Sequence, residues 1–289
     1  MKPRTGFFVV VIGLSVAAAV FAQQQQSLKI DVDLVMVNAT VTDSENRLVT
    51  DLKPENFQVF EDKVEQSIRY FSTEVAPLSL GIVFDVSHSM EKKIDFAREA
   101  AATFLEAGTP DDEYFLVEFN NRAKITEDFT TDISRLRDQL AFVPPAGTTA
   151  LYDAVYLGLS KVKKGRNPKK ALLLITDGED NHSRYSRGDI REFARESDVQ
   201  IFSIDLGRAL ISDLSEITGG HSFRGRVDDL QDICDKIAQE LKSQYLIGYA
   251  SSNTSMDGKY RKVRLKVNSP VGMAKFNVRS KDGYYAPTK

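Results

Sequence analysis

Cysteine and histidine are scarce in this sequence, and tryptophan is absent. The chain of 289 residues has one cysteine, Cys234, so it can form no intrachain disulfide and no zinc site of the Cys-x-x-Cys type. The sequence also lacks a His-Glu-x-x-His pair, a Gly-x-Ser-x-Gly motif and a P-loop. These absences exclude a disulfide-dense fold and remove the usual signatures of zinc proteases, serine esterases and nucleotide-binding enzymes.

Charge of one sign is not in excess either. The chain has 38 lysines and arginines against 41 aspartates and glutamates, which gives a formal net charge of −3. Because phosphate binding needs a basic footprint, this balance argues against nucleic acid as a partner. With 42% hydrophobic residues, the length allows one large domain or two smaller ones.

Long hydrophobic runs are limited to the first segment. An uncharged run of 16 residues ends at Ala22 and follows Lys2 and Arg4, whereas a membrane-spanning helix needs about 20 residues. We therefore predict that residues 1–22 are a secretory signal peptide cleaved before Gln23, with an uncleaved membrane anchor as the alternative. Loss of its two positive charges would change the net charge from −3 to −5. We expect a secreted, periplasmic or envelope protein with no transmembrane segment after cleavage.

The rest of the chain divides into three parts. Residues 23–76 and 245–289 show the alternation of apolar and polar residues that is typical of half-buried strands. Residues 77–244 alternate short apolar runs with helical stripes instead. Because isolated short sheets are marginally stable, we expect the two β-rich flanks to form one small β domain. The alternative is two independent extensions that pack on the middle section.

The middle section predicts an α/β fold. Its apolar runs at 81–84 and 172–175 do not alternate, as expected for strands that are covered on both faces. Repeated strand–helix units imply a doubly wound, Rossmann-like parallel sheet with helices on both faces. Ligands of such sheets gather beyond the carboxyl ends of the strands. The predicted strands are 78–85, 114–119, 171–176 and 199–206.

Oxygen-bearing side chains follow two of these strands and precede one helix. Asp85, Ser87 and Ser89 stand at spacing two after the first strand, Asp177 follows the third, and Thr149 precedes a helix. Neutral hydroxyls and two carboxylates suit a hard divalent cation. Each residue alone has a structural alternative, since Ser89 and Thr149 could cap helices and Asp177-Gly178 could form a turn. Asp153 more simply complements a helix N-terminus.

In this order, the segments resemble the metal-ion-dependent adhesion site (MIDAS) of von Willebrand factor A (VWA) domains. The matching residues are Asp85-x-Ser87-x-Ser89, Thr149, and Asp177 within Thr-Asp-Gly, and the resemblance covers roughly residues 78–244. It implies a VWA fold that holds Mg²⁺ or Mn²⁺, with Ca²⁺ as a further alternative. It also implies that the ion binds an acidic side chain of a partner protein.

Two departures from the family pattern concern the rim of this site. His88 stands where the family often has a small residue, and one glycine precedes Thr148, where two are common. Thr149 is therefore the assigned ligand, and Thr148 is the fallback. We place His88, Thr148 and Glu179 at the ligand rim.

The flanks are similar to a group of secreted bacterial VWA-related proteins known especially from acidobacteria. The shared features lie on both sides of the middle section. They are Asp51-Leu52, Asn56-Phe57 and Glu61-Asp62 before it, and Gln244 to Tyr249 and Gly283-Tyr284-Tyr285 after it.

We expect a non-enzymatic module that binds a partner protein through the metal. One alternative is a structural or envelope-assembly subunit whose metal only stabilises the fold. Another is a hydrolase that uses Ser87 or Ser89 with a histidine and an aspartate. The oligomeric state does not follow from the sequence.

Overall fold

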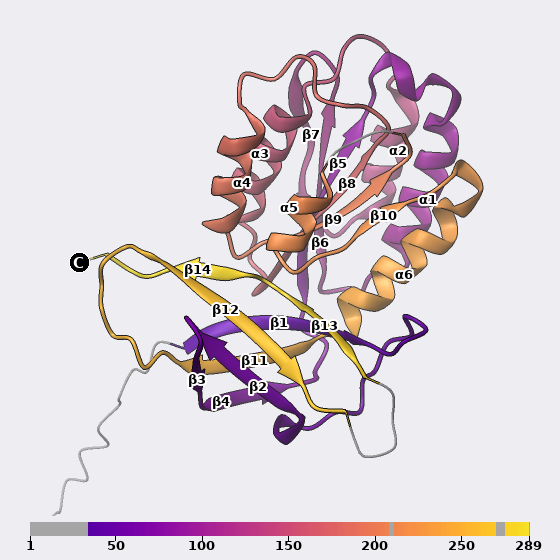
Figure 1. The fold of residues 1–289 in the computed structure, drawn as a ribbon. Helices are drawn as coiled ribbons and strands as arrows, with labels where there is room; N and C mark the ends of the chain where they lie inside the picture. The colour runs from indigo at the N-terminus through magenta and orange to yellow at the C-terminus, as the bar shows by residue number, and fades with distance from the viewer. Residues whose placement is uncertain (1–33, 208–210, 270–274, 289) are drawn as a thin grey trace, which may run out of the picture. The chain divides into compact units, whose positions relative to one another are not determined.

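The computed structural model describes residues 34–207, 211–269 and 275–288 (Figure 1). The predicted signal peptide, and the first residues of the β-rich segment 23–76, lie outside the described residues. Within the described ranges, no helix combines the length and apolar character that crossing a membrane requires.

A six-stranded sheet in the order β10-β9-β8-β5-β6-β7 forms the middle section (Figure 1). All neighbouring strands in it are parallel except β6 and β7, which pair antiparallel. The predicted doubly wound sheet is confirmed, but both edge strands were missed: β10 has only three residues, and in β7 the buried Glu127 interrupts the alternation. The strands are β5 (Leu78–Asp85), β6 (Glu113–Phe119), β7 (Ala123–Thr130), β8 (Lys169–Thr176), β9 (Gln200–Asp205) and β10 (Ser222–Arg224).

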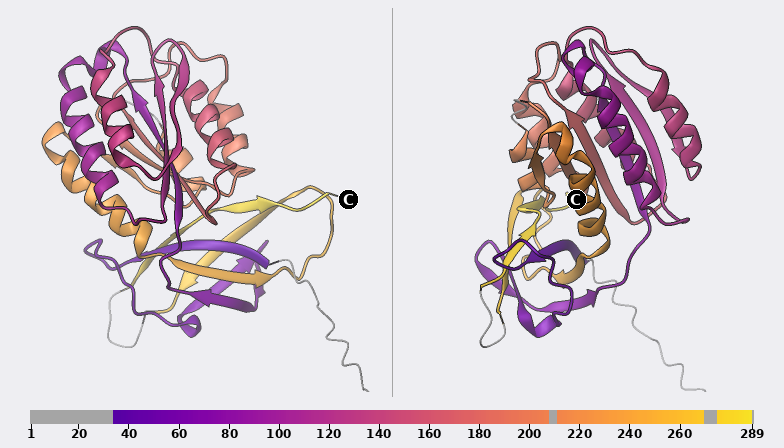
Figure 2. Two further views of the ribbon diagram at one scale, coloured as in Figure 1. Left: turned by 180° about the vertical axis from the view of Figure 1, so that it is seen from behind. Right: turned by 90° about the vertical axis from the view of Figure 1, so that its right-hand side faces the viewer.

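Helices cover both faces of this sheet (Figures 1 and 2). Leu136, Ile233 and Phe104 pack on one face, and Leu151, Ile190 and Leu214 pack on the other. All eight residues of β5 are buried, as the absence of alternation predicted. The first face is covered by α1 (Ile94–Glu106), α2 (Ile133–Phe142) and α6 (Leu230–Lys242), and the second by α3 (Leu151–Val162), α4 (Arg187–Arg195) and α5 (Ser212–Ile217).

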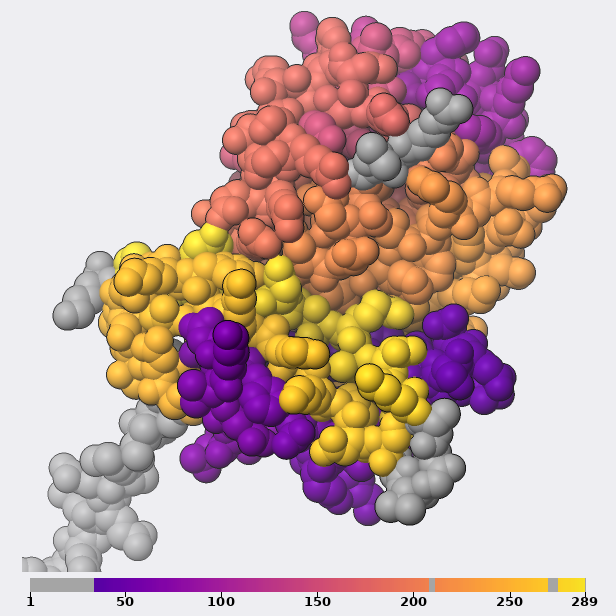
Figure 3. Space-filling model, viewed as in Figure 1, coloured from indigo at the N-terminus to yellow at the C-terminus, as the bar shows by residue number. Residues whose placement is uncertain are grey.

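The two flanks form one pair of packed sheets, with strand orders β13-β1-β11-β4 and β14-β12-β2-β3. Each sheet takes strands from both flanks, since β1 pairs with β11 and β2 pairs with β12. Figure 3 shows the first and last described segments, indigo and yellow, side by side. The joint β domain is therefore present. Its strands are β1 (Leu34–Thr42), β2 (Phe57–Glu61), β3 (Val64–Gln66), β4 (Ile68–Ser72), β11 (Tyr245–Ala250), β12 (Tyr260–Val267), β13 (Asn277–Ser280) and β14 (Gly283–Tyr285).

A buried carboxylate ties the two flanks together. Glu61, at the end of β2, accepts hydrogen bonds from the hydroxyls of Tyr249 at 2.8 Å, Tyr284 at 2.9 Å and Ser251 at 2.6 Å. Burial, followed by the hydrogen bond to Glu61, raises the pKa of Tyr249, so its hydroxyl stays protonated and donates. Residues of both flanks thus meet in one hydrogen-bond network inside the β domain.

We expect Glu61→Ala to lower the free energy of unfolding by roughly 2–4 kcal/mol, because it leaves buried hydroxyls without an acceptor. Urea denaturation measures this loss. Glu65→Ala is the matched control, because Glu65 is exposed on the neighbouring strand β3. Equal stability losses in the two variants would contradict a structural role for the Glu61 network.

Candidate metal site

Asp85 is held rigidly at the carboxyl end of β5. Its side chain is fully buried, and its Oδ1 accepts the Ser87 N–H at 2.8 Å. Its Oδ2 accepts the hydroxyl of Thr176 at 2.6 Å, from the last residue of the neighbouring strand β8. Because β5 and β8 run parallel, the two strand ends meet at one edge of the sheet.

A chain of hydrogen bonds connects Ser87 with Asp177. The hydroxyl oxygens of Ser87 and Ser89 lie 3.0 Å apart, and Ser89 Oγ donates to Asp177 Oδ1 at 2.7 Å. Ser87, Asp177 and Asp85 are all more than nine-tenths buried. The structure therefore brings together residues from loops 88 positions apart in the sequence.

Thr149 faces the same small space. A Cβ atom placed on Gly178 would lie 3.3 Å from Thr149 Oγ1 and 3.6 Å from Ser89 Oγ. The loop is fixed because Asn181 Oδ1 accepts the Thr149 N–H at 2.9 Å. Thr148 differs, because its N–H and hydroxyl both donate to Asn121 Oδ1. The structure thus favours Thr149 over Thr148 as the hydroxyl beside Ser89.

The hydroxyls of Ser89 and Thr149 do not cap helices. The N-cap of α1 is Lys93 and that of α3 is Ala150, and neither helix has a side-chain cap hydrogen bond. The helix-capping alternative for Ser89 and Thr149 is therefore wrong. Their oxygens face the cluster instead.

Two carboxylates in this cluster oppose each other electrostatically. Burial raises the pKa of Asp85, and the charge of Asp177 adds to that rise, although hydrogen bonds from Thr176 and Ser87 lower it. Lys93 compensates part of the charge, since its Nζ lies 2.6 Å from Asp177 Oδ2. Lys93 was not among the predicted site residues, because the sequence shows only that it follows Ser89 by four positions.

The donor set fits a hard divalent cation. Three hydroxyl oxygens and two carboxylates converge, and oxygen ligands of this kind suit Mg²⁺ or Mn²⁺. In the part of the chain that the structure describes, no group of three or more His, Cys, Asp or Glu side chains forms a metal site. An ion bound here would consequently depend on the hydroxyls as well as on the two carboxylates.

The remaining residues considered for the site lie around it or elsewhere. His88 and Glu179 are exposed, and the His88 N–H donates to the carbonyl of Gly147 at 3.1 Å. Asp153 is in the first turn of α3 and accepts hydrogen bonds from Arg184. Asp205 ends β9 and accepts the N–H of Gly207 and the guanidinium of Arg224.

Comparisons with known proteins identify the middle section. Residues 80–179, which include all five candidate ligands, match the model of the von Willebrand factor type A domain family. An uncharacterised protein of Borreliella burgdorferi is 26% identical over 136 residues, covering 44% of this chain and 40% of that protein. The match thus spans less than half of this curated relative.

Solved structures show the same fold. Proximal thread matrix protein 1 of the mussel byssus, described with a zinc-occupied MIDAS motif, is 20% identical with a TM-score of 0.52. The alignment covers 61% of this chain and 48% of that chain. A mutant of the PilB minor pilin of Streptococcus sanguinis is also similar, at 14% identity over 58% of this chain and 62% of the pilin, but its TM-score of 0.49 adds nothing to the fold assignment. The middle section of this chain therefore has the von Willebrand factor type A fold, and the β-rich flanks form sheets beside it.

Proposed function

We propose that this chain is an exported protein-binding module of the adhesion type, which grips an acidic side chain of its partner through a divalent cation. One observation supports this most directly. The oxygens of the candidate ligands converge at the carboxyl edge of the sheet, free of helix-capping roles. The proposed ligands are Asp85, Ser87, Ser89, Thr149 and Asp177.

The chain's own residues would set the properties of the ion. Thr176 and the Ser87 N–H orient the Asp85 carboxylate, so that it need not reorganise when an ion arrives. Two carboxylates offset the charge of one divalent ion, whereas the neutral hydroxyls leave it electron-poor. A bound ion supplies a Lewis-acidic position that accepts an external carboxylate. We propose Mg²⁺ or Mn²⁺, and the zinc-occupied motif of the mussel protein supports a divalent ion at this place.

We propose that the site binds rather than catalyses. Within the described residues, the hydroxyls of Ser87 and Ser89 hydrogen-bond to each other and to Asp177, not to a histidine. A serine hydrolase needs a general base next to its nucleophile, so this geometry supports a binding role. The exposed side chains of His88, Thr148 and Glu179 would then form the rim that a partner contacts.

We propose a secreted or envelope location because of the predicted signal peptide at residues 1–22. The likeness of both flanks to secreted bacterial VWA-related proteins supports this. Their shared motifs contribute to the packing of the β domain, as the contact between Glu61 and Tyr249 illustrates.

We expect Mg²⁺ to raise the melting temperature (Tm) of the purified chain, and a short peptide rich in Asp and Glu to raise it further only while Mg²⁺ is present. Mg²⁺ binds only the folded state, and the peptide adds a second linked equilibrium. The measurement is a thermal-shift titration, followed by capture of partners from envelope fractions with Mg²⁺ or with chelator. A peptide of the same length with Asn and Gln is the control. A Mg²⁺ shift with neither a peptide effect nor metal-dependent capture would overturn the binding role and favour a stabilising metal.

A further inference from the structure

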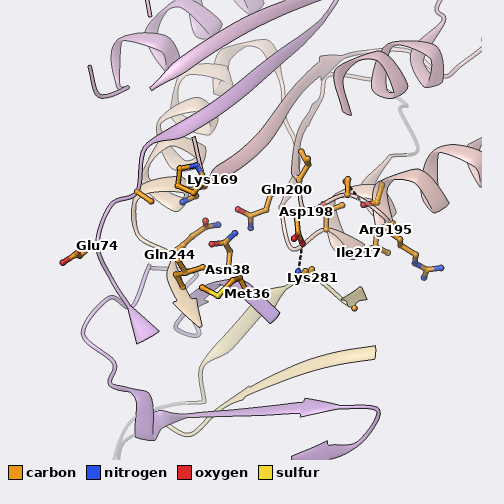
Figure 4. Close-up of a pocket in the computed structure, with 18 residues that line it drawn as sticks. Met36, Asn38, Glu74, Lys169, Arg195, Asp198, Gln200, Ile217, Gln244 and Lys281 are labelled. Atoms are coloured by element: carbon orange, nitrogen blue, oxygen red, sulfur yellow. Dashed lines mark hydrogen bonds and ion pairs between the residues drawn. The ribbon is translucent and has the colours of Figure 1, made fainter. Parts of the chain in front are cut away.

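A second cavity lies at the opposite end of the VWA sheet from the candidate metal site (Figure 4). Its volume is about 210 Å³. It is bounded by the first residues of β8 and β9, Lys169 and Gln200, and by Asn38 of β1 and Gln244 just before β11. Ligand pockets occur preferentially between domains, and this cavity separates the β domain from the VWA domain.

Two buried amide oxygens in this cavity have no hydrogen-bond partner among the described residues. Gln200 and Gln244 are 4% and 6% exposed, and the Oε1 atoms of both are unpaired. Gln200 Nε2 donates to the carbonyl of Gly219 at 3.1 Å, which fixes the orientation of its amide, since exchange of N and O would set two oxygens against each other. Gln244 Nε2 donates to Thr40 Oγ1 at 3.2 Å.

Unpaired buried acceptors require an explanation, because each is costly to leave without a donor. Figure 4 shows the carboxamides of Asn38, Gln200 and Gln244 directed toward the same part of the cavity. Strand alternation directs Gln244 and Leu246 into the cavity, while Tyr245 enters the β-domain core.

The charged residues around the cavity favour an uncharged ligand. Lys169 lines the wall, and burial lowers its pKa to about 8, while its ammonium donates to the carbonyl of Leu241. The positive charge of Lys169 would repel a cationic ligand. The partial negative charges of the two unpaired amide oxygens would repel an anionic ligand. Of the other charged residues in the lining, Lys281 and Asp198 form an ion pair at 2.5 Å, Arg195 pairs with Asp282 at 3.3 Å, and Figure 4 shows the exposed Glu74 pointing away from the cavity.

We propose that this cavity binds an uncharged, hydroxyl-rich molecule of the size of a monosaccharide. Its hydroxyls would donate to Gln200 Oε1 and Gln244 Oε1 and accept from the amide of Asn38, while its C–H face would contact Met36 and Leu246. A cavity of 150 Å³ holds the six-membered ring of benzene, so this space suits roughly eight to twelve non-hydrogen atoms. The inference is independent of the proposed metal function.

The test is ligand-observed NMR and calorimetry on the purified full chain with chelator present, so that the metal site cannot contribute. The probes are glucose, galactose and mannose, with glucuronate and glucosamine as charged comparators. We expect saturable binding of at least one neutral sugar with a dissociation constant in the millimolar range or below. Neither charged comparator should bind more tightly than its neutral counterpart.

Single substitutions test whether the sugar binds in this cavity. Gln200→Met should weaken the sugar roughly three- to tenfold, the usual effect of one lost neutral hydrogen bond. Gln139→Met makes the same change at an exposed position on α2 and should have no effect. Leu246→Phe fills part of the cavity with a larger side chain and should abolish binding.

Three results would overturn the proposal. The first is the absence of binding by every neutral sugar, which would mean that water alone fills the cavity. The second is equal binding by wild type and by folded Leu246→Phe, which would place the sugar elsewhere. The third is tighter binding of glucuronate or glucosamine, which would contradict the charge argument.

Discussion

Asp85→Ala is expected to abolish the Mg²⁺-dependent rise in Tm and the metal-dependent capture of a partner. Mg²⁺ at about one hundred times its dissociation constant stabilises a folded protein by about 2.7 kcal/mol, which for a chain of this size is roughly 5–10 °C. Asp85 supplies one of the two carboxylates in the donor set, and Thr176 and the Ser87 N–H hold it in place. Its loss removes both a ligand and half of the compensating charge.

The measurement is a Mg²⁺ titration followed by thermal unfolding, with circular dichroism to show that the variant is folded. The metal-free Tm of Asp85→Ala should itself fall, because Ser87 and Thr176 lose an acceptor, so each variant is compared with its own metal-free baseline. Asp85→Asn keeps an oxygen acceptor but removes the charge. It should likewise lose most of the Mg²⁺ response.

Asp205→Ala is the matched control for Asp85→Ala. Asp205 also ends a buried strand and also accepts the N–H two residues later, that of Gly207. It is not a member of the donor set, so the Mg²⁺ response should persist. A full Mg²⁺ response in Asp85→Ala, or its loss in both variants, would contradict the assignment of Asp85 as a ligand.

Lys93→Met is expected to tighten Mg²⁺ binding roughly tenfold. The Lys93 ammonium lies 2.6 Å from Asp177 Oδ2, so an ion that approaches Asp177 must compete with it. A charge-assisted hydrogen bond is worth about 1.5–3 kcal/mol, and each 1.4 kcal/mol corresponds to a factor of ten in affinity. We use the lower end of this range because the Lys93 side chain is 29% exposed and water screens the pair.

The same variant should be less stable than wild type without metal. Removal of Lys93 leaves the carboxylate of Asp177, whose side chain is 3% exposed, without its cation. We therefore expect opposite signs: a lower Tm in chelator and a larger rise in Tm with Mg²⁺. Calorimetric titration of Mg²⁺ and thermal unfolding measure the two effects.

Lys92→Met is the control, because Lys92 is the exposed neighbour in the same short helical turn, His88–Lys92. Neither the Mg²⁺ affinity nor the metal-free Tm should change much in it. An unchanged or weaker Mg²⁺ affinity in Lys93→Met would show that Lys93 and the ion do not compete for Asp177.

In the two flanks, some features can be predicted from the sequence and others depend on how the strands pair. Glu61 and Tyr249 both lie in flanks whose β character is visible in the sequence, but the hydrogen bond between them joins residues 188 positions apart. Gln244 lies only five residues before Tyr249, yet it lines the cavity. The side to which each residue points depends on the pairing of β1 with β11.

The α/β class, the β-rich character of both flanks and the order of the oxygen-bearing segments could all be predicted from the amino-acid sequence. These properties are local, since burial on both faces removes alternation from a strand and an amphipathic helix repeats every 3.6 residues. The buried runs at β5 and β8 could therefore be predicted without knowledge of their neighbours.

Which side chains contact one another depends on the folded arrangement of the strands. Strand order and register place Ser89 beside Asp177, bring Lys93 onto the same carboxylate and leave Gln200 and Gln244 facing one cavity. The antiparallel strand β7 likewise depends on its pairing with β6, because its own pattern is interrupted by Glu127. Contacts between residues far apart in the chain leave no periodic pattern in the sequence, because they form only when the strands pair in the folded sheet.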